Sequence, residues 1–159
     1  MILKRGVTGF SAGDLSLERD WVAQTAEFKK YCYASVQQLN GCILAFFEPD
    51  IDLGYAHAHV KIDGEELYIF HNNMYDDIAF TSNRDIGGLK FTDHKLLGAL
   101  FENRYTVLTA SQLAEPLVYQ TQSGGIILMN ENELNDVELH FMKHFRSQTV
   151  GDLVFNYWD

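Results

Sequence analysis

Apolar side chains recur every three or four positions through residues 20–40, and this spacing predicts an amphipathic helix with one buried stripe. The stripe consists of Trp21, Phe28, Cys32, Ser35, Val36 and Leu39. The Asn40-Gly41 pair predicts the end of this helix, because glycine readily takes the left-handed conformation that follows a helix.

Short apolar or alternating runs then predict strands over residues 42–47, 54–62, 65–70 and 77–81. Asp63-Gly64 between two such runs is a strong signal for a β-hairpin. Alternation places two sets of side chains on opposite faces of the first hairpin strand: Ala56, Ala58, Val60 and Ile62 on one, and Tyr55, His57, His59 and Lys61 on the other. Counting across the turn pairs His57 with Phe70, and His71 with Ala56.

The pattern of the second half of the chain predicts several short helices and strands. They are a helix over 94–102 capped by Thr92 or Asp93, a strand over 105–109, a helical turn over 111–115, a hairpin of 117–122 with 126–129, a helix over 133–145, and a terminal helix docked through Val150, Leu153, Val154, Tyr157 and Trp158. The predicted fold class is α+β, a mostly antiparallel central sheet with N-terminal and C-terminal helices packed on it, in a single domain over residues 1–159.

Charge narrows the classes of partner. The chain has 159 residues and a formal net charge of −10. Between residues 31 and 83 there are eight acids and one base, Lys61. Nucleic acids and anionic lipids require basic surfaces, so we expect neither direct nucleic-acid binding nor membrane association. A basic protein is the partner that such a surface attracts.

Localisation and chemistry follow from what the sequence does not contain. No apolar run is long enough to cross a bilayer and no secretory leader opens the chain, so we expect a cytoplasmic protein. Cys32 and Cys42 are predicted to be small core residues. There is no phosphate-binding loop and no nucleophile elbow. We therefore expect a protein without a cofactor that is not an enzyme.

Histidines supply the alternative to that expectation. His57 and His59 point to the same side of their strand and suit two ligands of one metal ion, with His71 as a third if the hairpin brings it near. The predicted pairing puts His71 on the opposite face, unless a β-bulge changes the parity. His140 and His144 share a helix face, but Phe141 follows His140 where a metalloprotease helix has its glutamate.

Acids and tyrosines from residue 48 to residue 77 predict a partner-binding surface in which the acids steer a basic partner and the tyrosines anchor it. The predicted contact residues are Asp50, Asp52, Tyr55, Glu65, Glu66, Tyr68, Tyr75, Asp76 and Asp77. The competing surface is a second acidic group with fewer aromatic neighbours: Glu131, Glu133, Asp136 and Glu138.

The two ends of the chain, LKRGVTGF over residues 3–10 and GDLVFNYWD over 151–159, resemble the ends of a family of small bacterial immunity proteins. Such proteins accompany polymorphic or contact-dependent toxins. The resemblance implies a toxin inhibitor that binds a cognate toxin domain in the cytoplasm of the producing cell. Two other functions stay open: a metal-dependent enzyme built on His57 and His59, and an acidic adaptor protein without catalysis.

Overall fold

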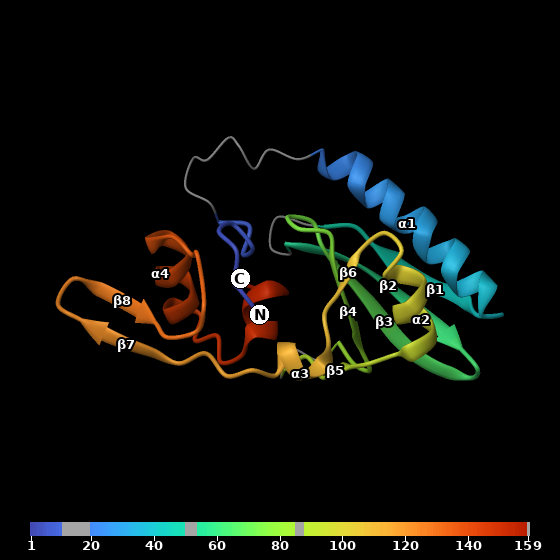
Figure 1. The fold of residues 1–159 in the computed structure, drawn as a ribbon. Helices are drawn as coiled ribbons and strands as arrows, with labels where there is room; N and C mark the ends of the chain where they lie inside the picture. Colours follow the sequence, from blue (N-terminus) through green and yellow to red (C-terminus); the bar gives the residue numbers. More distant parts are fainter. Residues whose placement is uncertain (11–19, 50–53, 85–87, 159) are drawn as a thin grey trace.

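An antiparallel meander forms the centre of the molecule (Figure 1). The computed structural model describes residues 1–10, 20–49, 54–84 and 88–158. The main sheet contains β1 (Cys42–Phe47), β2 (Tyr55–Ile62), β3 (Glu65–Asn72), β4 (Asp77–Thr81), β5 (Phe91–Thr92) and β6 (Thr106–Val107). Strands β1 to β5 follow one another in space, and β6 pairs with β4 in parallel. The predicted α+β class is confirmed.

The β2–β3 hairpin has the register that the sequence predicts. His57 lies opposite Phe70, and His71 lies opposite Ala56. Asp63 and Gly64 form the two-residue turn with φ angles of 50° and 84°. Both angles are positive, as a type I′ turn requires, and this turn type matches the twist of the strands.

Helix α1 (Trp21–Gln38) covers one face of the sheet together with α2 (Lys95–Phe101). Phe28, Cys32 and Val36 of α1 pack there against the alanine and valine side chains of β2. The prediction for the end of α1 was wrong in one respect: Asn40, not Gly41, takes the left-handed conformation, with a φ of 54°. Gly41 serves close packing instead, because a Cβ there would lie 2.6 Å from the Lys61 carbonyl oxygen.

The opposite face of the sheet is partly covered by what we call the C-terminal lobe, made of β7 (Tyr119–Gln122), β8 (Gly125–Leu128), α4 (Asp136–His144), α5 (Val150–Val154) and residues 1–10. The short helix α3 (Ala110–Leu113) precedes this lobe in the chain. Leu153, Phe155 and Trp158 are buried in the same core as Tyr55 and Phe70 of the sheet. The docked terminal segment is therefore confirmed.

Three local predictions need correction. Helix α5 ends at Val154, so Tyr157 is 52% exposed while Phe155 is buried. The N-cap of α2 is His94, whose Nδ1 accepts a hydrogen bond from the Leu97 backbone N–H at 3.2 Å. Cys32 is buried, but Cys42 is exposed because it begins β1, at the edge of the sheet.

The two chain ends that carry the family resemblance lie against each other. The Asn156 side-chain amide donates to the Thr8 carbonyl at 3.0 Å. Asn72 of β3 donates to the carbonyl oxygens of both Val7 and Val154, at 3.0 and 2.7 Å. The Asn156 amide thus joins the two ends to each other, and the Asn72 amide holds both of them to the sheet. None of the helices in the described part of the chain has the length and apolar character needed to span a membrane.

Candidate functional site

The predicted acidic surface is divided between the two ends of β3. Glu65 and Glu66 begin this eight-residue strand, next to the turn, and both are exposed. Tyr75, Asp76 and Asp77 follow its other end. At about 3.3 Å per residue the two groups lie more than about 20 Å apart. Asp50 and Asp52 lie outside the described residues. The acids that the structure describes are thus not gathered into one patch.

The acids beyond β3 interact with the rest of the protein. Asp76 Oδ1 lies 3.2 Å from His71 Nε2, and its Oδ2 accepts from Arg104 at 3.4 Å. Asp77 is buried at the start of β4. Burial raises the pKa of Asp77 to about 6, although Lys4 acts in the opposite direction. Both side chains therefore contribute to local packing and electrostatics more than to an open acidic surface.

The three predicted tyrosines lie in different surroundings. Tyr55 is buried and stacks on Phe70, with ring centroids 4.7 Å apart. Tyr68 is half-buried and stacks on His59 at 4.4 Å. Tyr75 donates its hydroxyl hydrogen to the Arg5 carbonyl. Of the three, Tyr68 is the one beside an exposed predicted acid. The His59 ring on which it stacks also contacts Glu66, whose carboxylate oxygen lies 2.9 Å from His59 Nε2.

The histidines of the alternative metal site do not converge. His57 and His71 are on opposite faces of the β2–β3 hairpin, as their register requires. His71 stacks on Phe28 under α1, whereas His57 stacks on Phe47 on the other face. Within the described ranges, no group of three or more histidines, cysteines and acids is placed to hold a metal ion.

His57 is completely buried, and neither ring nitrogen has a hydrogen-bond partner in the described part of the protein. Burial lowers the pKa of His57 to about 3, with Arg84 and His59 acting in the same direction. The imidazole is therefore neutral at physiological pH. An unpaired buried imidazole costs stability, since its polar atoms have lost their water.

Glu138, part of the second predicted acidic surface, is fully buried. Its carboxylate accepts hydrogen bonds from the Gly6 N–H at 3.0 Å, the Thr8 hydroxyl at 2.8 Å and the Asn135 N–H at 3.1 Å. It joins the N-terminal segment to the first turn of α4. Glu131, Glu133 and Asp136 are exposed and remain accessible to a partner.

Beside these acids lies an uncovered apolar surface, the outer face of the β7–β8 hairpin. Val118, Ile127 and Met129 are 54%, 46% and 59% exposed. The Met129 N–H donates to the Val118 carbonyl at 2.7 Å, and Ile127 is two positions before Met129, so all three project from the same side. Leu128 projects from the other side and is buried. In the sequence, this surface is indicated by the absence of charged residues from positions 117–130.

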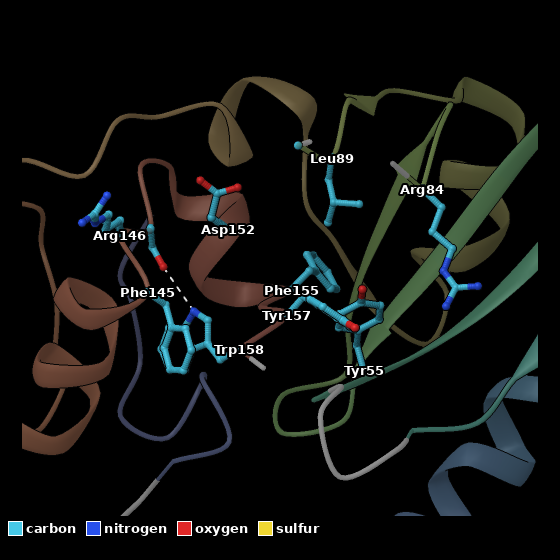
Figure 2. A pocket seen from close by; sticks show the side chains of 11 residues that line it. Tyr55, Arg84, Leu89, Phe145, Arg146, Asp152, Phe155, Tyr157 and Trp158 are labelled. Atoms are coloured by element: carbon cyan, nitrogen blue, oxygen red, sulfur yellow. Dashed lines mark hydrogen bonds between the residues drawn. The ribbon is translucent and has the colours of Figure 1, made fainter. Parts of the chain in front are cut away.

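A pocket of about 500 Å³ lies where the sheet meets the C-terminal lobe (Figure 2). Its lining comes from β2, the segment after β4, the end of α4, and α5 with the residues after it. The residues used below are Tyr55, Arg84, Arg146, Ser147, Asp152, Tyr157 and Trp158. They are separated by up to about a hundred positions in the chain, so no short sequence motif predicts the pocket.

Comparison with known proteins adds no assignment. No protein-family model, curated protein or solved structure matches this chain.

Proposed function

We propose that this chain is a non-catalytic binding protein of the immunity type, which neutralises a basic toxin domain in the cytoplasm of the producing cell. The observation that carries the proposal is the outer face of the β7–β8 hairpin, where three apolar side chains are exposed beside acids. The accessible acids are Glu115, Glu131, Glu133 and Asp136.

This arrangement has the composition of a protein interface. Interfaces that bury a partner have an apolar centre from which charged residues are depleted, and a polar rim. Val118, Ile127 and Met129 supply the apolar centre, and the Asn130 amide ties Glu115 to the base of the hairpin with a hydrogen bond of 2.9 Å. Acids at a rim increase the association rate of a basic partner, while buried apolar contacts lengthen the lifetime of the complex.

The β2–β3 turn offers a second contact region for the same partner. Glu65 and Glu66 are exposed there, and Tyr68 is half-buried beside them. This region has less exposed apolar surface than the β7–β8 face. We therefore expect its acids to speed the association of the partner, and its apolar contacts to contribute little to the lifetime of the complex. An acidic adaptor would use the same surfaces and differ only in its partner.

The experiment starts from the protein encoded immediately upstream of this gene, which the proposal expects to end in a toxin domain, and it tests that domain against the full chain. We expect Ile127→Ser with Met129→Ser to weaken binding by at least about thirtyfold, mainly through faster dissociation, in surface plasmon resonance. Glu131→Lys with Glu133→Lys should slow association and reduce its salt dependence. Leu96→Ser is the matched control, because Leu96 is 54% exposed on α2, far from this lobe.

Two outcomes would contradict the proposal. If the hairpin variants bind normally while Glu65→Lys with Glu66→Lys abolishes binding, the interface is at the β2–β3 turn. If the upstream protein has no toxin domain, or its toxin domain neither binds nor loses activity, the immunity function is wrong.

A further inference from the structure

Arg146 occupies a backbone position that normally belongs to glycine. Helix α4 ends in a Schellman motif, in which the Ser147 N–H donates to the Met142 carbonyl at 3.1 Å and the Arg146 N–H to the Lys143 carbonyl at 3.2 Å. Arg146 has a φ of 56°. The other non-glycine residues with positive φ in the described ranges are Asn or Asp, which tolerate this conformation. Strain of this kind often marks a side chain retained for function.

The Arg146 side chain lines the pocket between the sheet and the C-terminal lobe, together with Arg84. In the part of the chain that the structure describes, neither arginine forms an ion pair, whereas Arg104 pairs with Glu27 and Asp76. The acid in the lining, Asp152, is already occupied: its Oδ2 accepts from the Gln148 and Thr149 N–H groups at 3.0 and 2.9 Å. An acidic chain thus places two arginines without an ion pair among the described residues around one cavity. The Arg84 guanidinium also lies 4.6 Å from the centroid of the Phe47 ring, which orients it without neutralising its charge.

Hydroxyl groups and apolar walls complete the pocket. Figure 2 shows Arg84 and Arg146 at opposite ends, with Tyr55 and Tyr157 beside each other toward the Arg84 end. Burial raises the pKa of Tyr55 to about 12, so its hydroxyl is protonated and can donate a hydrogen bond to a ligand. The Ser147 oxygen accepts from the Trp158 indole N–H at 3.3 Å. Among the described residues the Ser147 hydroxyl donates no hydrogen bond, so its hydrogen is a donor for a ligand.

We propose that this pocket binds a small elongated ligand that carries an anionic group, carboxylate or phosphate, at each end of an apolar middle. Arg84 and Arg146 would bind the two ends, since guanidinium groups form paired hydrogen bonds with such anions. Phe155, Leu89 and Trp158 would contact the middle. The volume is in the range of small-molecule sites. This site does not depend on the proposed partner.

The test uses the purified full chain and three families of probe: linear dicarboxylates of increasing length, the monocarboxylates of matched length, and inorganic pyrophosphate. Binding is measured by titration calorimetry and by Trp158 fluorescence in a Trp21→Phe background. We expect one dicarboxylate length to bind best, and about tenfold more tightly than its monocarboxylate. If pyrophosphate binds more tightly than every dicarboxylate, the pocket is a compact phosphate site and the proposed elongated ligand with an apolar middle is wrong.

Variants separate binding from folding. Arg84→Gln and Arg146→Gln should each weaken binding of the best dicarboxylate about tenfold, whereas Lys95→Gln, an equal change of charge on α2, should not. Arg146→Gly should raise the melting temperature, because glycine relieves the strain, and still weaken binding. Absence of binding by every probe, equal binding by the arginine variants, or full binding by Arg146→Gly would overturn the proposal.

Discussion

The β2–β3 and β7–β8 hairpins have similar local designs and different surroundings. Each is antiparallel with a two-residue turn, Asp63-Gly64 in one and Ser123-Gly124 in the other. The β2–β3 hairpin lies within the main sheet, and over most of its length helices and the C-terminal lobe cover both faces. The β7–β8 hairpin forms a two-stranded sheet, which packs on α4 with one face and exposes the other. Alternation separates the two faces of a strand, but it does not say which faces will be covered.

The largest expected difference between the hairpins is the effect of shortening an isoleucine. Ile69 of β3 is fully buried, whereas Ile127 of β8 is 46% exposed. We expect Ile69→Ala to lower the free energy of unfolding by about 2–5 kcal/mol, because it leaves a cavity between closely packed side chains. Ile127→Ala should change it by less than about 0.5 kcal/mol. Urea unfolding of both variants measures the contrast, and similar losses would show that the outer face of β7–β8 is covered.

The second difference is in the dependence of stability on pH, which two buried groups control, one in the β2–β3 hairpin and one in the neighbouring strand β4. His57 has its pKa lowered from 6.5 to about 3, so below pH 6.5 the unfolded chain binds a proton that the folded chain does not. The free energy of unfolding then falls as the pH falls. Asp77, next to this hairpin in β4, has its pKa raised from 3.8 to about 6, so the folded chain takes up its proton first. That contribution to the free energy of unfolding rises as the pH falls from 6 to 4.

Single substitutions separate these opposing contributions. Between pH 6 and pH 4, Asp77→Asn should lose stability as the pH falls, whereas His57→Phe should gain it, each by about 2 kcal/mol. In the unsubstituted chain the two contributions largely cancel. Urea unfolding at unit steps of pH measures the slopes. Parallel curves for both variants and the unsubstituted chain would contradict the burial of these groups.

The smallest effect concerns the turns. Gly64 has a φ of 84°, so Gly64→Ala should cost about 1 kcal/mol by placing an alanine in the left-handed region. Gly124 is not among the residues with positive φ, and nothing lies within 4 Å of the Cβ that alanine would add. Gly124→Ala should therefore be neutral or slightly stabilising. Thermal unfolding compares the two, and equal losses would show that the turns need the same glycine geometry.

Sequence patterns predicted most of the elements because their causes are local. The Asp63-Gly64 turn determines the pairing of His57 with Phe70, and the apolar stripe of residues 20–40 determines α1. Predictions that depended on partners distant in the chain were less accurate. Exposed Cys42 and buried Tyr55 each depend on which segment packs beside them. The His94 cap is a local contact with the Leu97 N–H, and it was missed because histidine is not among the usual N-cap residues.

For the candidate sites, the sequence supplied composition and the tertiary structure supplied proximity. The sequence alone determined the net charge, the uncharged run over residues 117–130 and the opposite faces of His57 and His71. Only the folded chain decided that Glu138 is buried beneath the N-terminal segment, and that Arg84 and Arg146 line one pocket. The physical reason is range: turns, caps and periodicity act over a few residues, whereas burial and pockets arise when segments a hundred residues apart pack together.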